Sequence, residues 1–151
     1  MTDEPVRELI DTLGRVVPAW LEGCVVITAE RRLGACPDEL VADARAMAAR
    51  EGPRVLAEME DLLLADVDEQ RGNPLAVLRA AVRHPTGVLA EAGIEPVPRD
   101  AFDVERFPDD RYGLVPATWS DVHPDLHDPG IHWGAWKAAT VLHRRRAGGA
   151  T

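Results

Sequence analysis

The segment from Trp119 to Trp136 concentrates residue types that could do chemistry. Its eighteen residues, WSDVHPDLHDPGIHWGAW, hold three of the five histidines, three aspartates and three of the four tryptophans of the chain. Imidazole and carboxylate groups bind metals or transfer protons, and large rings cover ligands or partner surfaces. No other stretch of the sequence is as rich in these types, so this segment is the first candidate for a functional site.

One hypothesis for this segment is a metal site that supports hydrolysis. Imidazole with carboxylate suits zinc or another divalent metal, and the candidate ligands are His123, His127, His132, Asp121 and Asp128. Two histidines four residues apart share a helix face in the motif HExxH, but here Pro124 follows the first histidine and the glutamate is absent. The alternative is turn chemistry, in which these side chains bond the local backbone and no cofactor is bound. We favour the second interpretation.

The aromatic residues of the segment also have two interpretations. His132, Trp133 and Trp136 stand at the start of the last predicted helix, where residues three or four apart share a face. Together with Trp119 they could line a ligand site or form the centre of a protein interface. Tryptophan also buries a large area and directs its N–H to a nearby carbonyl. We therefore favour a role in pinning the preceding segment to the core.

A third candidate lies on an acidic helix predicted at 54–69. Within it, AEMEDLLLADV resembles the ExxD helix of the all-α nucleoside triphosphate pyrophosphohydrolases of the MazG and dUTPase type, through Glu58 and Asp61. The resemblance implies magnesium held on a triphosphate by two acidic helices, but the paired ExxE is absent from the preceding helix. A solvated acidic face is the favoured alternative. Asp66 is a further ligand candidate, because it falls within the apolar arc of this helix and a buried carboxylate needs a partner.

The elements that must position these residues are predicted from hydrophobic periodicity. Near the N-terminus, apolar residues recur at alternating intervals of four and three, which indicates an amphipathic helix with a seam for another helix: Val6, Ile10, Leu13, Val17, Trp20, Cys24 and Ile27. Pro18 predicts a kink or break near 14–17, because proline lacks a backbone donor. The stretch 25–28 could form a strand, but no partner strand is evident, so we expect helix.

Glycine and proline divide the following residues into shorter predicted helices. Gly34 ends the first helix, a second runs from about 37 to 51, and Gly52-Pro53 is predicted to break it from the acidic helix. The next helix begins near 75 and ends at His84-Pro85, because the residue before proline resists helical geometry. Thr86 is expected to cap a further turn that Gly93 closes.

From 94 to 130 the character of the sequence changes. Six of the twelve prolines lie there, acids are dense in DAFDVERFPDD, and we expect an irregular arm. Large side chains should anchor it to the core: Phe102, Phe107, Tyr112, Leu114, Val115 and Trp119. A last helix is predicted at 131–146. The predicted fold is a single all-α domain, 1–151, in which an irregular bundle of about five helices has its core at 4–93.

Composition limits the kinds of partner. The formal net charge is −9 and the pI about 5.0, which argues against binding nucleic acid or an anionic membrane. No run of 18 apolar residues exists and the N-terminus MTDEPVREL is acidic, so we expect no membrane span and a cytoplasmic protein. Cys24 and Cys36 are expected to be free thiols, the first of them buried and inert. The dominance of arginine over lysine is typical of GC-rich, actinobacteria-like coding.

The function predicted from the sequence is binding rather than catalysis. No GxSxG, P-loop, GxGxxG or zinc-finger spacing is present. The leading hypothesis is a small cytoplasmic interaction or accessory protein that self-associates or binds another protein. The alternatives are a metal-dependent hydrolase that uses the His and Asp residues of 121–132, and a MazG-like magnesium-dependent nucleotide pyrophosphohydrolase.

Overall fold

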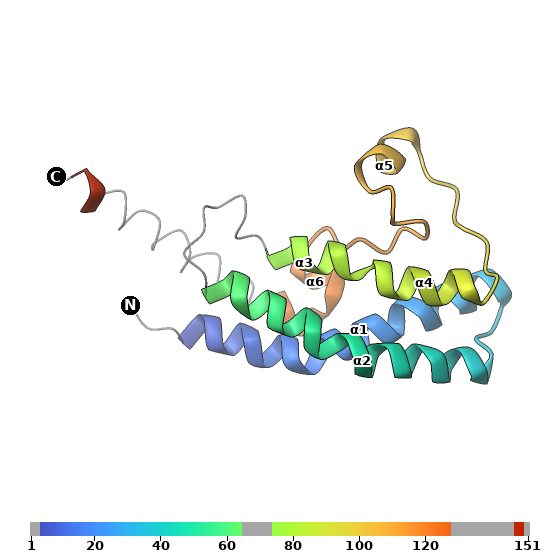
Figure 1. Cartoon of the computed structure of the whole chain (residues 1–151), viewed down its shortest axis with the longest axis horizontal. Coiled ribbons are helices and arrows are strands. Elements are labelled where there is room, and N and C mark those ends of the chain that lie inside the picture. Colours follow the sequence, from blue (N-terminus) through green and yellow to red (C-terminus); the bar gives the residue numbers. More distant parts are fainter. Residues whose placement is uncertain (1–3, 65–73, 128–146, 150–151) are drawn as a thin grey trace.

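Every regular element that the computed structural model describes is a helix, which confirms the predicted all-α class (Figure 1). The structure describes residues 4–64, 74–127 and 147–149. The helices within these ranges are α1 (Glu4–Leu33), α2 (Asp38–Leu64), α3 (Pro74–Ala81), α4 (Arg83–Glu91), α5 (Ala101–Arg106), α6 (Trp119–Val122) and the 3-10 helix η1 (Pro124–Leu126). The helix predicted at 131–146 lies outside the described residues.

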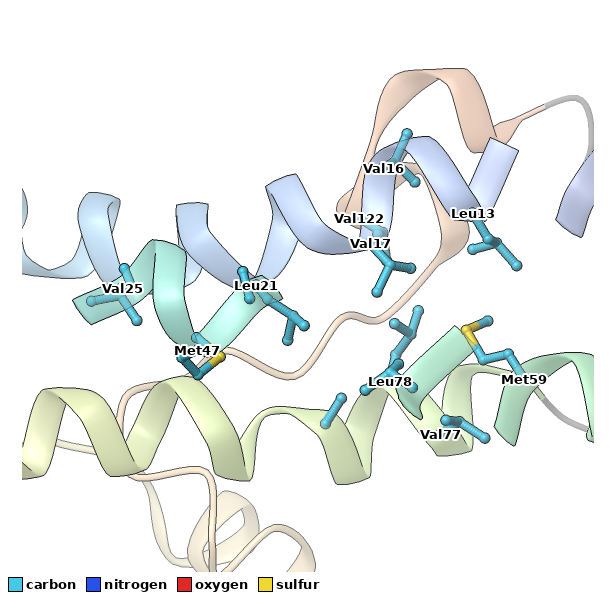
Figure 2. Close-up of a cluster of buried hydrophobic side chains, with 14 of the residues drawn as sticks. Leu13, Val16, Val17, Leu21, Val25, Met47, Met59, Val77, Leu78 and Val122 are labelled. Atoms are coloured by element: carbon cyan, nitrogen blue, oxygen red, sulfur yellow. The ribbon is translucent and has the colours of Figure 1, made fainter. Parts of the chain in front are cut away.

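Helices α1 and α2 form a long hairpin that carries most of the core. Gly34 closes it with a left-handed φ of +83°, and its N–H donates to Glu30 O at 2.8 Å. Glycine suits this turn because it lacks the Cβ that would clash there. The hairpin then brings two apolar stripes together, and α3 and α4 cover them from one side (Figures 1 and 2). The largest fully buried side chains are Leu9, Leu13, Leu21, Met47, Met59, Leu78, Leu89 and Leu126.

Two prolines lie inside these long helices without ending them. α1 runs unbroken through Pro18, and residues 25–28 are helical as expected; α2 runs unbroken through Gly52-Pro53, so the predicted break there is wrong. A Cβ on Gly52 would come within 3.3 Å of Pro18 Cγ, which places the two interruptions at one close approach of the helices. Buried apolar residues on both flanks hold each helix in register, so tertiary packing overrides the local cost of proline.

The boundary between α3 and α4 also differs from the prediction. α3 ends at Ala81 and α4 begins at Arg83, so His84-Pro85 lies in the first turn of α4 and does not end a helix. Proline is tolerated there because the first N–H groups of a helix have no intrahelical acceptor. Thr86 is consequently inside α4, not at its cap. Gly93, with φ +75°, ends the helix as predicted, with Ile94 N–H donating to Leu89 O at 3.1 Å.

The arm is more regular than predicted, because α5, α6 and η1 all lie within it. Tyr112 anchors it: the phenol donates to Ile94 O at 2.5 Å, and the ring is buried. Val122 and Leu126 pack into the core beside α1, and Leu114 and Trp119 lie partly buried against it. Phe102, however, is 63% exposed, so its predicted role as an anchor is wrong.

Helix α1 is long and apolar enough to cross a membrane, judged by length and composition alone. The most apolar 18-residue window within Arg7–Leu33 has a mean hydropathy of 1.2, and 44% of that window is buried within the fold. Core helices of soluble proteins and N-terminal signal sequences meet the same criterion. In this fold its apolar stripe packs against α2 and α4, which accounts for the composition of the helix.

Candidate functional site

The carboxylate of Asp121 caps a helix. Its Oδ2 accepts hydrogen bonds from Ala117 N at 3.0 Å and from Thr118 N at 2.9 Å, and with Thr118 it forms a capping box at the start of α6. A capping box satisfies backbone N–H groups that the first turn of a helix leaves without acceptors. This candidate metal ligand thus has a structural role that the local sequence explains.

His123 and Asp125 are likewise used in local contacts. His123 Nδ1 accepts from Asp125 N at 3.1 Å at the start of η1, and Asp125 Oδ2 lies 3.5 Å from Arg15 Nη1 of α1. His127 is exposed at the end of η1. These are the side-chain-to-backbone bonds of turn chemistry, the interpretation that we favoured.

No group of three or more His, Cys, Asp or Glu side chains that could hold a metal ion occurs in 4–64, 74–127 or 147–149. Two of the five candidate ligands, Asp128 and His132, lie outside these ranges, so the zinc hypothesis stays a prediction. Trp133, Trp136 and Asp66 lie outside them as well. Trp119, the remaining aromatic candidate, packs partly buried against the core.

The acidic face of α2 is solvated where the structure describes it. Glu58 is half-exposed and pairs with Arg54 one turn earlier, at 3.4 Å, while Asp61 is exposed. An exposed pair of this kind contributes little to stability. The magnesium site implied by the resemblance to pyrophosphohydrolases would need a second acidic helix beside this face.

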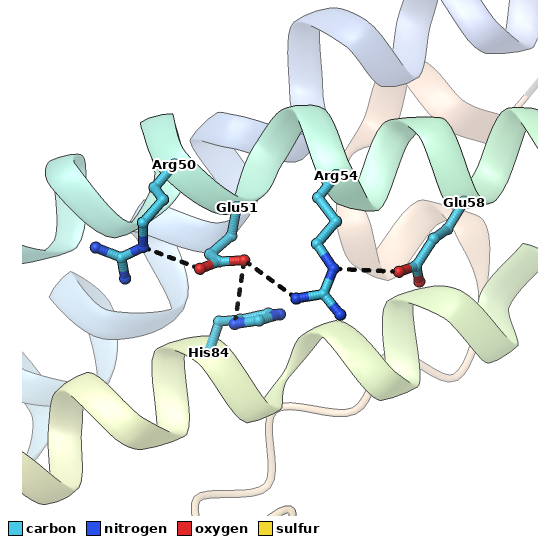
Figure 3. A network of polar contacts seen from close by, with 5 residues as sticks. All are labelled: Arg50, Glu51, Arg54, Glu58 and His84. Atoms are coloured by element: carbon cyan, nitrogen blue, oxygen red, sulfur yellow. Dashed lines mark hydrogen bonds and ion pairs between the residues drawn. The ribbon is translucent and has the colours of Figure 1, made fainter.

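A polar network joins α2 to α4 through Glu51 (Figure 3). Glu51 Oε1 accepts from Arg50 Nε at 2.9 Å, and Oε2 lies 3.8 Å from Arg54 Nη1 and 3.6 Å from His84 Nδ1. The hydrogen bond from Arg50 lowers the pKa of Glu51 from its ordinary value of 4.5; burial opposes this change, and the charge of His84 adds to it. The network fixes α4 against α2 with a charge that solvent only partly reaches.

The two cysteines are free thiols, as expected. Burial raises the pKa of Cys24 to about 12, and the carboxylate of Asp110 adds to the rise. Burial also raises the pKa of Cys36, with further contributions from Glu30 and Asp38. A thiol reacts as its thiolate, so neither cysteine has the environment of a nucleophile.

The feature that sequence reasoning missed is a pocket of about 450 Å³ between α3, α5 and the loop at 107–117. Three arginines line it, Arg79 from α3 and Arg99 and Arg106 from the arm, together with Asp103, Phe107 and Asp110. A second hollow of about 260 Å³ adjoins it and shares Arg79, Arg106 and Phe107. The pocket is therefore a basic site on an acidic chain.

All three arginines contact Phe107, two of them through its ring and one through its backbone carbonyl. The guanidinium carbons of Arg79 and Arg106 lie 5.9 and 5.1 Å from its centroid, within the range of cation–π attraction. Arg99 Nη1 donates to Phe107 O at 2.6 Å, which ties the third arginine to the same residue. Because cation–π contacts use the ring face, they position a guanidinium without consuming its N–H groups.

Asp110 stabilises the wall of the pocket. Its carboxylate is buried and accepts from Leu114 N at 2.6 Å and from Val115 N at 3.0 Å. It thereby fixes the turn at Gly113, where φ is +66°. The sequence gives only an indirect indication of this pocket, the acidic and aromatic run DAFDVERFPDD, because Arg79 is twenty residues from Arg99.

Comparison of the chain with protein-family models, with curated protein sequences and with solved structures found no match.

Proposed function

We propose that this chain is a small cytoplasmic accessory protein that acts by binding, and that it self-associates through α5. The observation that carries the proposal is Phe102, which is 63% exposed on this helix. Figure 1 shows α5 on the arm, set apart from the helices that form the core. A large ring kept in water on a projecting element favours burial against a partner.

The local structure holds this ring in place for contact. Asp100 caps α5 by accepting from Asp103 N at 2.8 Å, and Arg106 stacks over the Phe102 ring at 5.8 Å. Residues four apart share a helix face, so ring and guanidinium present one surface. Aromatic residues and arginine are enriched at the centres of protein interfaces.

The partner that this surface fits is a second copy of the same chain. When the two-fold axis is perpendicular to two paired α5 helices, the helices run antiparallel, and Phe102 of one copy then lies against Arg106 of the other. The acidic residues Asp103 and Glu105 lie near the same guanidinium group of the opposite copy. Each copy thus offers a guanidinium group to acidic residues of the other copy, and this reciprocity is what an isologous contact needs. A contact built on six residues a side is small, so we expect weak association.

Sedimentation velocity over a wide range of protein concentration tests the proposal. Wild type is expected to form a dimer whose fraction rises with concentration, and Phe102→Ala to stay monomeric. Val104→Ala is the matched control, because Val104 is 46% exposed on the same helix but two residues away, on the other face. A wild type that stays monomeric throughout, or a Phe102→Ala variant that dimerises as wild type does, would sink the proposal.

A further inference from the structure

The pocket between α3, α5 and the 107–117 loop carries hydrogen-bond donors that the fold does not use. Arg79 Nε is buried and has no hydrogen-bond partner among the residues that the structure describes. A buried donor without an acceptor is destabilising, and more so when the group is charged. Nε itself is not reached from the pocket, but the fold supplies no acceptor for it, and the residue that carries it lines the pocket.

The other two arginines of the pocket, Arg99 and Arg106, also have N–H groups that the fold leaves available to a ligand. Arg106 is held by two rings, at 5.1 Å from Phe107 and 5.8 Å from Phe102, and it makes no hydrogen bond or ion pair with any residue that the structure describes. Arg99 uses Nη1 on the Phe107 carbonyl at 2.6 Å and has further N–H groups. Three guanidinium groups therefore line one pocket, and the contacts that position them leave most of their donors unused.

The two acids of the lining do not neutralise these donors. Both carboxylate oxygens of Asp110 accept backbone N–H groups, from Leu114 and Val115, and no ion pair with Arg79 or Arg106 forms within the parts of the chain that the structure describes. Asp103 lies in the first turn of α5 and is the remaining acceptor of the wall. A ligand that fits must satisfy arginine donors and offer one donor of its own.

We propose that this pocket binds a small organic phosphate monoester that carries hydroxyl groups. The planar fork of arginine matches the oxygens of a phosphate group, and three guanidinium groups suit its double negative charge. A hydroxyl group of the ligand donates to Asp103. The volume of about 450 Å³ is that of a small-molecule site. The inference does not rest on the self-association proposed above, although both proposals use Arg106 and Asp103.

Isothermal titration calorimetry with ribose 5-phosphate tests the inference, with ribose, inorganic phosphate and succinate as comparison probes. We expect saturable binding of ribose 5-phosphate at one site per chain, weaker binding of inorganic phosphate, and none of ribose. Removal of a charged hydrogen-bond donor costs about 1.5 to 3 kcal/mol, so Arg79→Gln and Arg106→Gln should each weaken binding by roughly ten- to a hundredfold.

Arg111→Gln is the matched control, because Arg111 lies on the same loop and is exposed but does not line the pocket. Its affinity should equal that of wild type. Circular dichroism checks folding; if Arg79→Gln is misfolded, the exposed Arg106 decides the result. The inference is overturned if folded wild type binds no phosphate probe, if succinate binds as tightly as ribose 5-phosphate, or if Arg111→Gln weakens binding as much as Arg106→Gln.

Discussion

Glu51 is the residue whose charge joins two helices of the core, and its contribution to stability should depend on pH. Its pKa in the folded protein is lowered, first by the hydrogen bond from Arg50. A group with a depressed folded pKa stabilises the fold above its ordinary value, here 4.5, and loses that contribution as the pH falls through the folded value. Glu51→Gln should therefore melt at a lower temperature than wild type at neutral pH, and this gap should close as the pH falls from about 7 to about 3.

Glu58→Gln is the control for this measurement. Glu58 lies one helical turn beyond Arg54, and its substitution removes the same charge, but its side chain is half-exposed and pairs with Arg54 of its own helix rather than with a residue of α4. Its melting temperature at neutral pH should stay close to that of wild type, since exposed pairs of this kind contribute little. Equal losses in the two variants, or a gap for Glu51→Gln that persists at low pH, would show that the network does not act through its ionised carboxylate.

Among single residues, the local side-chain-to-backbone hydrogen bonds could be predicted from the sequence, but the pocket lined by three arginines could not. Asp121 and His123 bond backbone groups within four residues, and such local contacts follow from residue type and spacing. Arg79 and Arg106 are 27 residues apart, and they meet only because the arm folds back over α3. Nothing in the periodicity of either segment encodes that path.

Gly52 decides how closely α1 and α2 approach. Its substitution should show whether packing or helix propensity has the larger effect on the free energy of unfolding. A Cβ at this position would lie 3.3 Å from Pro18 Cγ, tighter than ordinary contact, and the proline ring is rigid and part of α1, so it cannot rotate away. Overpacking of a core costs about 1 to 3 kcal/mol, and the gain from glycine to alanine within a helix is only about 1 kcal/mol. Gly52→Ala should thus lower the free energy of unfolding, measured by urea denaturation.

Gly14→Ala and Gly23→Ala provide the comparison. Both glycines lie inside α1, and a Cβ on either meets nothing within 4 Å. Each variant should gain roughly 0.5 to 1 kcal/mol, the ordinary benefit of replacing a helical glycine. If Gly52→Ala gains stability as they do, the close approach at Pro18 is not a constraint on the hairpin.

Element types were easier to predict than element boundaries. The apolar stripes of α1 and α2 identified both as helical, and Gly34 and Gly93 end helices where expected. The errors fell at Pro53 and Pro85, where local geometry argues for a break. Pro53 is held by the packing of both flanks of α2, and Pro85 occupies a first turn that needs no donor. A proline in the sequence therefore indicates that a helix is locally less stable there, but it does not by itself predict that the helix ends there.

At the scale of the whole molecule, the net charge of −9 opposes the self-association proposed for α5. Two such copies repel over distances comparable to the Debye length, about 10 Å in 0.1 M salt. Lowering the pH towards the pI of about 5.0 removes this repulsion. Arg106 remains charged over this pH range, because arginine is not deprotonated in proteins. Sedimentation should accordingly show a dimer several-fold tighter at about pH 5.5 than at about pH 8.

Phe102→Ala distinguishes this effect from general precipitation near the isoelectric point. It keeps the net charge, so any loss of repulsion is the same as in wild type, but it removes the ring that the contact buries. The variant should remain monomeric at both pH values. Tightening of the same size in wild type and in Phe102→Ala would mean that α5 does not form the contact, and that the low net charge alone drives the chains together. A specific dimer instead requires both reduced repulsion and the exposed ring.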